Sequence, residues 1–388
     1  MRLLSFSIFL LSILSCNSQK SNIYFLDPRS WKENSIKLSD LSDDIQYIPL
    51  DNKYAYSAFM PKIKGNSMYA CIKDSGIVQF DRQGKMIRNI GRKGRGPGEY
   101  IYGMYFDIDE KTGTLYVLDS KQIKIYSKTG RFIKSLPIEE NGENFDAIYY
   151  YNSHLFIPKT IDGFSPKYNW IILDTLGHLI KKKENTILSI TANTGGTLNV
   201  YKFKGNIYYS NWYDDSVYCI LPNFDYKVSY VYNVGEKRLP GTSLANDPPT
   251  YMKQMGQYVI HGNLFETNRF LVLDYRYDKN SIAMLDKTNN KVYMNYTRVQ
   301  ERTVTCGIEN DLDGGIMFML YDDSYYTENN IEYLIGLIDP FVLKSHIAST
   351  DFKNSVPKDP EKKNALEKFA NSIKETDNPI LMMIKLKN

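Results

Sequence analysis

An internal repeat of short apolar strands constrains the fold of this chain more than any other feature. In its clearest copy, Thr114–Asp119, Gln122–Tyr126 and Arg131–Leu136 read as three strands separated by polar or glycine-containing turns. The same order recurs in five other places. The corresponding apolar residues, 40 to 63 positions apart, are Met68, Leu115, Leu155, Ile207, Phe270 and Ile316. One such unit cannot cover both of its own faces, so neighbouring units must pack against it on each side.

A ring of these units satisfies that requirement without leaving open ends. The 32 tyrosines and 18 phenylalanines of the 388-residue chain suit half-buried pleated surfaces. The sequence therefore predicts an all-β fold, a six-bladed β-propeller over residues 44–388. Ile380–Leu386 is expected to be a strand of the last blade, with Ile45–Leu50 from the other end of the chain as its outer strand, so that the two termini close the ring.

The sixth unit is expected to be interrupted by helices. Residues 331–346 and 366–373 carry apolar side chains at three- and four-residue intervals, which is helical spacing. Prolines punctuate the same region. We predict a helical excursion over about 325–376 inside the last blade. The alternative is that Glu332–Leu337 is itself the third strand of that blade.

One junction between units resembles an NHL repeat. The glycine-rich stretch Ile90–Tyr100 precedes the apolar strands Leu115–Asp119 and Ile123–Tyr126, which end in Asp and in an aromatic residue. From Asp44 onward, the chain resembles the six-bladed propeller lipoproteins of Bacteroidetes. Asp44–Leu50 near the start and Asp377–Leu381 near the end carry this wider resemblance. It implies the fold, and it implies little about function.

The N-terminus predicts export and a lipid anchor. Arg2 precedes the apolar run Leu3–Leu14, which has the length of a signal-peptide core and is too short to span a bilayer. A serine and then Cys16 follow, as in a lipobox, so Cys16 is the predicted lipidation site. Residues 1–15 are then the signal peptide and 16–43 a lipidated cysteine with a polar tether. The protein would be an outer-membrane lipoprotein facing the periplasm or the cell surface. The alternative is an ordinary signal peptide followed by a chance cysteine.

The net charge and the cysteines bear on which partners and which chemistry the chain can have. The net charge of +4 is mild for this length and its charges are mixed, which gives no case for nucleic acid as a partner. Cys71, Cys219 and Cys306 each lie in or beside a strand-like run. They are expected to be small buried hydrophobic residues, with a metal or redox role, or one disulfide, as the alternatives.

Strand direction predicts where a ligand would bind. In a blade of alternating strands, the loops between second and third strands emerge on the same face as the connections between blades. Aromatic residues beside Asp and Arg in these loops suit a glycan or peptide ligand. The alternative is that they cap strand ends and cover blade edges. The predicted ligand-binding residues are Trp212, Tyr213, Tyr275, Arg276 and Tyr277, with Tyr325 and Tyr326 as weaker candidates.

The glycine-rich connection adds two basic candidates to the same face. Gly91 to Gly98 do not form a phosphate loop, because no Gly-Lys-Ser/Thr follows and the stretch leads into a strand. Arg92 and Arg95 would give the face a positive spot for an acidic ligand, or form a solvated turn.

Catalytic motifs are sparse in this sequence. The four histidines lie far apart without metal-ligand spacing, and no Gly-x-Ser-x-Gly motif occurs. We therefore expect a binding module without a cofactor, whose partner is a glycan, a peptide or a protein. One alternative is a metal-dependent hydrolase or lyase, with a channel-bound divalent cation near Asp214-Asp215 or Asp322-Asp323. A second is a structural subunit of an outer-membrane assembly.

Overall fold

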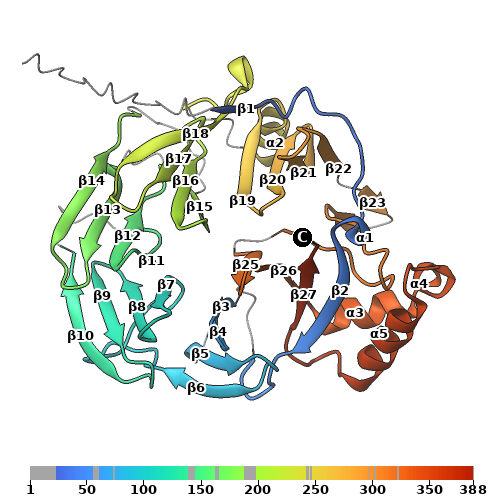
Figure 1. Cartoon of the computed structure of the whole chain (residues 1–388), viewed down its shortest axis with the longest axis horizontal. Coiled ribbons are helices and arrows are strands. Elements are labelled where there is room, and N and C mark those ends of the chain that lie inside the picture. The colour runs from blue at the N-terminus through green and yellow to red at the C-terminus, as the bar shows by residue number, and fades with distance from the viewer. Residues whose placement is uncertain are drawn as a thin grey trace, which may run out of the picture.

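Six small antiparallel sheets form a ring in the computed structural model, and the fold is a six-bladed β-propeller (Figure 1). Each blade runs outward from the axis in four strands. Because successive strands reverse direction, the second-to-third loops and the connections between blades share one face, here called the upper face. The other two turns of each blade lie on the opposite, lower face. The structure describes residues 23–55, 61–72, 75–138, 145–161, 166–187, 198–241, 244, 247–296, 298–300, 303–320 and 323–387.

The first three blades follow the predicted units. Blade 1 consists of β3 (Lys62–Lys64), β4 (Ser67–Ile72), β5 (Gly76–Asp81) and β6 (Met86–Ile90). Blade 2 consists of β7 (Phe106–Asp109), β8 (Thr114–Asp119), β9 (Gln122–Tyr126) and β10 (Phe132–Pro137). Blade 3 consists of β11 (Tyr149–Tyr151), β12 (His154–Pro158), β13 (Tyr168–Asp174) and β14 (Leu179–Glu184).

The other three blades include both ends of the chain. Blade 4 consists of β15 (Leu198–Phe203), β16 (Asn206–Asn211), β17 (Ser216–Ile220) and β18 (Tyr226–Tyr232), with β1 (Tyr24–Leu26) added at its edge. Blade 5 consists of β19 (Ile260–Glu266), β20 (Phe270–Tyr277), β21 (Lys279–Asp286) and β22 (Val292–Tyr296). Blade 6 consists of β25 (Tyr325–Glu328), β26 (Ile331–Ile338), β27 (Ile380–Leu386) and β2 (Ser42–Pro49).

Packing between blades explains the aromatic composition. The middle strands are buried on both faces, and six of the seven residues of β13 are buried. Phe156 packs its ring against Trp170 in its own blade and against Tyr209 of blade 4, with centroids 5.8 and 6.1 Å apart. Large flat side chains fill the space between two twisted sheets. The blades therefore hold one another through their faces.

The predicted closure of the ring is confirmed. β2 pairs antiparallel with β27, from Ser42 opposite Leu386 to Pro49 opposite Ile380. The first long strand of the chain therefore completes the last blade.

The helical excursion is confirmed, but its limits are wrong. Ile331–Ile338 is not helical: it is β26, paired with β25 and β27, and hence the second strand of the blade. Its apolar residues fit helical spacing because neighbouring blades bury parts of both its faces, which removes a clean alternation. Helices begin only after β26. They are α3 (Pro340–Ala348), α4 (Thr350–Asn354) and α5 (Pro360–Ser372).

The predicted start of the sixth unit is also wrong. Residues 314–319 form a loop, tied to the preceding segment through the single bridge between Ile308 and Phe318. Phe318 is fully buried in the core, so the run is apolar without being a strand of the blade. The inner strand of blade 6 is instead β25.

The segment predicted to be a tether is part of the domain from Ile23 onward, which corrects the 16–43 boundary. β1 pairs in parallel with β18, and α1 (Leu38–Leu41) precedes β2. Leu26, Ile36 and Leu38 are buried because the segment covers the outside of blades 4 and 5. The segment was predicted to be a tether because most of its residues are polar and these few buried apolar residues form no regular pattern.

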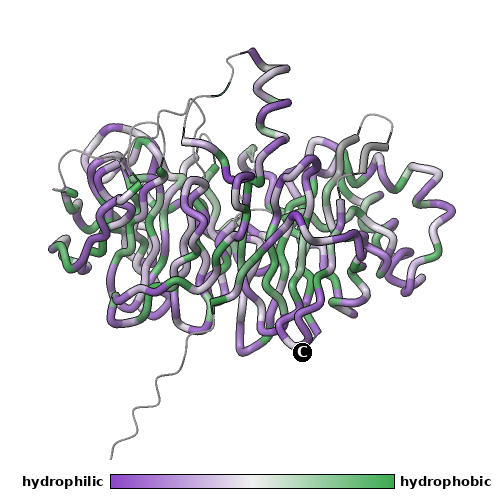
Figure 2. The backbone as a smooth tube through the Cα atoms, turned by 90° about the horizontal axis from the view of Figure 1, so that it is seen from above, coloured by the Kyte–Doolittle hydropathy of each residue, from purple (hydrophilic) through white to green (hydrophobic). Residues whose placement is uncertain are grey.

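Small elements lie between the blades. The connection from blade 4 to blade 5 contains the 3-10 helix η1 (Gly235–Lys237) and α2 (Pro248–Met255), and α2 stands out from the upper face (Figure 2). A hairpin of β23 (Arg298–Gln300) and β24 (Thr303–Thr305) follows blade 5. Among the residues described, none of the helices has the length and apolar character needed to cross a membrane.

Candidate functional site

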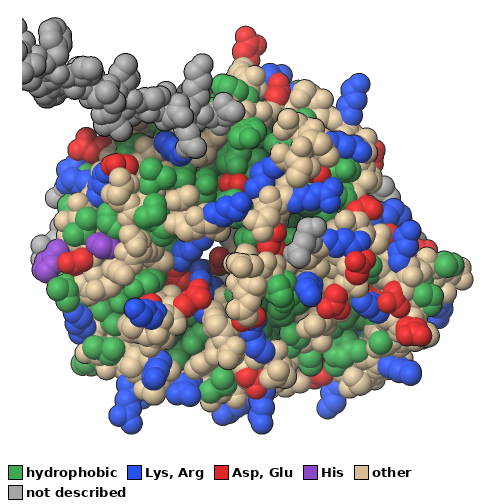
Figure 3. Space-filling model, in the orientation of Figure 1, with side chains coloured by type: hydrophobic (Ala, Val, Ile, Leu, Met, Phe, Trp, Pro, Cys, Tyr) green, Lys and Arg blue, Asp and Glu red, His purple; other side chains and the backbone are tan. Residues whose placement is uncertain are grey.

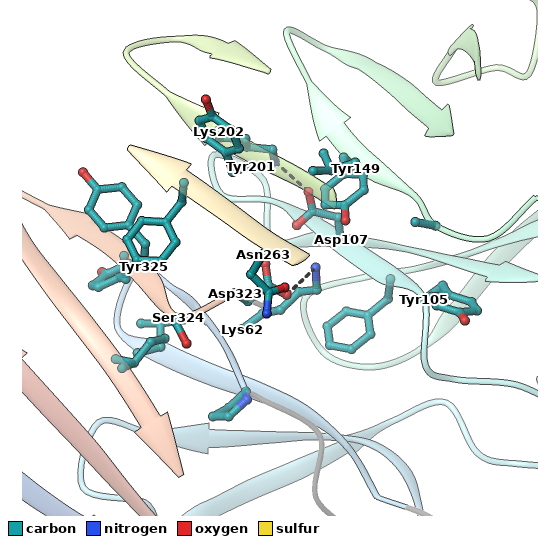
Figure 4. Close-up of a pocket in the computed structure, with 18 of the residues that line it drawn as sticks. Lys62, Tyr105, Asp107, Tyr149, Tyr201, Lys202, Asn263, Asp323, Ser324 and Tyr325 are labelled. Carbon is teal, nitrogen blue, oxygen red and sulfur yellow. Dashed lines mark hydrogen bonds and ion pairs between the residues drawn. The ribbon is translucent and has the colours of Figure 1, made fainter. Parts of the chain in front are cut away.

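A cavity of about 830 Å³ lies on the propeller axis, where the six inner strands meet. This volume is typical of small-ligand pockets. Figure 3 looks onto the lower face and shows the hollow at the centre of the ring. Each blade contributes to the lining, and one residue from each in order is Lys62, Asp107, Tyr149, Lys202, Asn263 and Tyr325 (Figure 4).

A buried ion pair forms the centre of the polar lining. Asp107 on β7 is 1% exposed and accepts a hydrogen bond of 2.7 Å from Lys202 Nζ on β15. Its carboxylate also accepts the backbone N–H of Tyr150 at 2.8 Å, and Lys202 donates to the Tyr150 carbonyl at 2.7 Å. Three blades thus meet at this pair.

The surrounding charges decide the protonation of Asp107. Burial by itself would raise the pKa of this carboxyl group, but the ammonium groups of Lys202, Lys64 and Lys62 outweigh it and hold the pKa well below its usual range. Burial lowers the pKa of Lys202, and the positive charges of Lys64 and Lys62 add to that effect. The carboxylate is therefore a fixed negative charge, with more than one cation around it.

The other two lysines are paired with more exposed acids. Lys62 Nζ lies 3.2 Å from Asp323 Oδ2, and Lys64 Nζ lies 3.1 Å from Glu110 Oε1. The lysine side chains are 16% and 19% exposed, whereas Asp323 is 40% and Glu110 58% exposed. Exposed acids can rotate into solvent, while the shielded ammonium groups stay in the cavity. The arrangement can therefore accept an anionic group from a ligand.

Aromatic side chains complete the lining. Lys62 Nζ lies 5.1 Å from the centroid of the Tyr149 ring. Tyr325 stacks on Phe265 with centroids 5.5 Å apart, which fixes it against blade 5. Tyr105, at the upper end of β7, is 41% exposed. Its ring adds an exposed aromatic surface to this part of the lining.

A second buried acid supports this wall of the cavity. Tyr201 on β15 donates to Glu266 Oε1 at 3.0 Å, and Lys287 lies 3.0 Å from Glu266 Oε2. Burial and the neighbouring Glu266 carboxylate raise the pKa of Tyr201 well above its usual value, so the phenol stays neutral. This network fixes β15 against β19, and thereby the strand that carries Lys202.

The predicted aromatic pair of blade 4 lies on the upper face but away from the cavity. Tyr213 is 4% exposed and Trp212 half-buried, in a cluster with Ile161, Met255 and Leu239. Asp214 accepts the backbone N–H of Ser216, and Asp215 pairs with Arg238. This loop packs under α2.

The predicted residues of blade 5 belong to a strand. Tyr275, Arg276 and Tyr277 are the last three residues of β20, and Tyr275 is 5% exposed. Its ring meets Trp31 edge-on, 5.6 Å between centroids. In the described part of the chain, none of these three lines the axial cavity.

The glycine-rich connection lies on the upper face, as predicted. The buried side chain of Tyr100 attaches it to blade 1. Arg92 and Arg95 are exposed, and Arg92 pairs with Glu99. Tyr100 is fully buried, where its hydroxyl accepts the N–H of Ile77 at 2.6 Å and donates to the Ile90 carbonyl at 2.8 Å. The stretch therefore has a structural role, because it fixes the connection between blades 1 and 2 in place.

The cysteines and the acids of the predicted metal site are the remaining candidates. Cys16 lies outside the described residues, and so does Asp322. Cys71 and Cys219 are buried, as expected of small hydrophobic residues, and Cys306 is half-buried; within the described part of the chain none of the three forms a disulfide. Within the described ranges, no three His, Cys, Asp or Glu side chains lie close enough together to hold a metal ion.

Sequence reasoning missed most of the residues that line the cavity. The exceptions are the weaker candidates Tyr325 and Tyr326, and Asp323 of the metal alternative, which all lie in its lining. Lys62 and Asp107 lie on inner strands of three and four residues, which are too short to show an apolar pattern. Lys202 lies on the longer inner strand β15, on the side that faces the cavity. The hairpin register offers a signal, because Asp107 pairs with Tyr116 and Lys62 with Tyr69, one tight turn before the recognised second strands. A charged residue at that offset points to the axis.

Comparison with known proteins supports the fold. A protein of Bacteroides fragilis named as exported has a crystal structure that is 18% identical, covers 94% of this chain and 100% of its own, and has a TM-score of 0.65. A member of the duf4221 family from Bacteroides vulgatus is 9% identical, covers 92% and 100%, and has a TM-score of 0.53. No curated protein sequence matches.

A family model agrees with the limits of the ring. It matches residues 23–385, which run from just before the strand added to blade 4 into the last strand, β27. The match includes the segment once expected to be a tether, in agreement with its packing against blades 4 and 5. The chain belongs to the family described as Domain of unknown function (DUF4934).

Proposed function

We propose that this protein is a binding module of the bacterial cell envelope, whose ligand occupies the axial cavity. The signal peptide and Cys16 would export and anchor it, and a structural relative is named as an exported protein. The observation that carries the proposal is the cavity itself, about 830 Å³ in volume and lined by all six blades. A rigid ring that presents six strands to one point is suited to hold a ligand without rearranging.

The lining favours a ligand with an anionic group beside a ring or apolar face. Lys62 and Lys202 would bind the anion, with Asp323 moving away, and Tyr105 would stack on the adjoining face. Acidic glycans and acidic peptides share this chemistry. Trp212, Arg276, Tyr277, Arg92 and Arg95 remain proposed as further contacts on the upper face, which the buried Tyr213 and Tyr275 would support from within.

Thermal shifts of the mature chain test this proposal. The probes are a galacturonate trimer, a glutamate tripeptide and the neutral sugar maltotriose, each added at rising concentration. A ligand at 100 times its dissociation constant stabilises the fold by about 2.7 kcal/mol. We expect stabilisation by an acidic probe and none by maltotriose. The acidic probe that acts identifies the ligand class as glycan or peptide.

Two matched lysine substitutions locate the binding. Lys202→Met should abolish the stabilisation, because it removes the ammonium group at the centre of the cavity. Lys227→Met, on the exposed outer strand of blade 4, should leave it unchanged. Equal responses in the two variants would place the anion outside the cavity.

The enzyme alternative makes a different prediction in the same assay. A channel-bound divalent cation would need several oxygen or nitrogen ligands converging on the axis. Stabilisation by a divalent metal alone, lost on replacing Asp107 or Asp323, would favour that alternative over an anion-binding module.

A further inference from the structure

Blades 1 to 4 expose apolar side chains at one repeated position, just after the turn from the third to the outer strand. The sequence there is Gly, a basic residue or His, two apolar residues, and a basic residue. It occurs as Gly84-Lys-Met-Ile-Arg88, Gly130-Arg-Phe-Ile-Lys134 and Gly177-His-Leu-Ile-Lys181. Because these turns all lie on the lower face, the repeated residues form a rim around its edge.

The exposure of this rim is large for apolar residues. The second apolar residue of each copy, Ile87, Ile133 and Ile180, is 43%, 53% and 46% exposed. The residues before them and in the corresponding place of blade 4 add to the rim, which we call the lower rim. Its members are Ile87, Ile133, Leu176, Leu179, Ile180 and Tyr226. Phe132 is not one of them, because its ring packs on Gly98 of the connection between blades 1 and 2 and against Tyr126.

In blade 5 the chain itself covers the same position. Val292 follows the corresponding turn, packs against the core and is only half exposed. The N-terminal segment lies over this strand: Asn34 is bridged to Met294, and its side chain donates a hydrogen bond of 3.2 Å to the Val292 carbonyl. No segment of the described chain covers the lower rim in this way, so an outside surface is the natural cover.

The direction of the N-terminal strand identifies that surface. β1 runs parallel to β18, which starts on the lower face, so the chain enters β1 from the lower side. Twenty-two residues precede Ile23, and they contain the proposed lipid anchor at Cys16. Tyr24 and Phe25 on β1 are 45% and 68% exposed. An anchor attached on this side draws the lower face toward the bilayer.

The charges of the rim fit a lipid surface. A basic residue flanks the apolar pair on both sides in blades 1 and 2, at Lys85 and Arg88 and at Arg131 and Lys134. Figure 3 shows hydrophobic side chains between Lys and Arg side chains around the edge of the lower face. Apolar residues that enter the interface beside cations that meet anionic headgroups are typical of peripheral membrane contact.

We propose that the lower rim rests on an anionic lipid surface, so that the upper face and its end of the cavity point away from the membrane. The lipid anchor of the proposed function, on which this proposal rests, brings the lower face to the membrane. The rim residues then make the contact with the lipid. A ligand would then enter the cavity from the upper side.

Flotation with vesicles tests the contact without the lipid anchor. The mature chain from Asn17, which contains the complete ring, is mixed with vesicles of phosphatidylcholine and phosphatidylglycerol in a 7:3 ratio, or of phosphatidylcholine alone. We expect binding to the anionic vesicles, weaker binding to the neutral ones and release by salt. The double variant Ile133→Asp with Ile180→Asp should bind at least about tenfold more weakly, since two apolar contacts are lost and two negative charges added.

A matched control separates the rim from general surface hydrophobicity. Phe341→Asp with Val342→Asp changes two residues on α3 that are 56% and 47% exposed, away from the lower rim. This variant should bind as the unchanged protein does. No binding by the unchanged protein, or an equal loss in both variants, overturns the proposal. A protein partner that co-purifies only when the rim is intact, without vesicle binding, also overturns it.

Failure here is distinguishable from failure of the proposed function. Stabilisation by acidic probes depends on Lys202 and should be the same in the rim variant. Palmitate labelling of the full chain, lost in Cys16→Ser, tests the anchor by itself. Vesicle binding without labelling would keep the rim and remove the anchor.

Discussion

At the scale of single residues, His261 makes stability depend on pH. It is 5% exposed, and its ring stacks on Tyr232 with centroids 4.3 Å apart. Burial lowers the pKa of His261 from 6.5 to about 4, partly opposed by a hydrogen bond with the backbone of Asn211. Below pH 6.5 the unfolded chain therefore takes up a proton that the folded protein refuses until about pH 4. The stability is complete above pH 6.5 and falls as the pH drops from there to 4.

The expected loss from this group is about 2 kcal/mol between pH 7.5 and pH 5. Urea unfolding at the two pH values measures it. His261→Phe keeps an aromatic ring on Tyr232 but cannot be protonated, so its stability should fall by that much less. An equal fall in the two proteins would mean that other groups carry the pH dependence.

The individual ligand-binding residues were the part of the structure that the sequence predicted least well. Tyr213 and Tyr275 were predicted in a binding face because aromatic residues beside Asp or Arg suit ligands. The same residues suit a buried apolar environment. Tyr213 is buried under α2 and Tyr275 against Trp31 of the N-terminal segment. Sequence does not separate the two uses, since the difference lies in which distant segment of the chain covers the ring.

At the scale of elements, a strand could be predicted from the sequence where its apolar residues follow a clear pattern. Five units were predicted because glycine or asparagine turns separate strands with a clear apolar pattern. β26 was predicted as helix because Ile331, Leu334, Ile335 and Ile338 fit a helical stripe, and burial of parts of both faces hides the strand period. The inner strands β3, β7 and β11 were missed because three or four residues that line a polar cavity carry little apolar signal.

The added strand β1 gives the clearest test at this scale. Leu26 is 1% exposed in the core shared by blades 4 and 5, whereas its neighbour Phe25 is 68% exposed. Leu26→Ala should destabilise the protein by about 2 to 5 kcal/mol, because it leaves a cavity under the covering segment. Phe25→Ala should change stability by less than about 0.5 kcal/mol in solution. Urea midpoints measure both, and similar values would mean that the segment covers the ring only loosely.

At the scale of the whole molecule, the ring depends on a strand pairing between residues about 340 positions apart. β27 lies between β26 and β2, so its backbone groups bond on both sides. Ile380, Leu381 and Ile384 are fully buried, which places the C-terminal strand among the most buried elements of the fold. If the pairing between β2 and β27 opened, blade 6 would lose its outer strand and blades 1 and 5 would lose a rigid neighbour.

Hydrogen exchange of the intact protein measures whether the closure is as stable as the rest. Amides of β27 should exchange as slowly as those of β8 in blade 2, because both require opening of the whole ring. Fast exchange confined to β2 and β27 would mean that the closure opens locally while packing between blades holds the other five. That outcome bears on the axial cavity, because β25 is in the same sheet and carries Tyr325 in its lining. A ring that opens at blade 6 would admit a ligand sideways, whereas a closed ring admits it only along the axis.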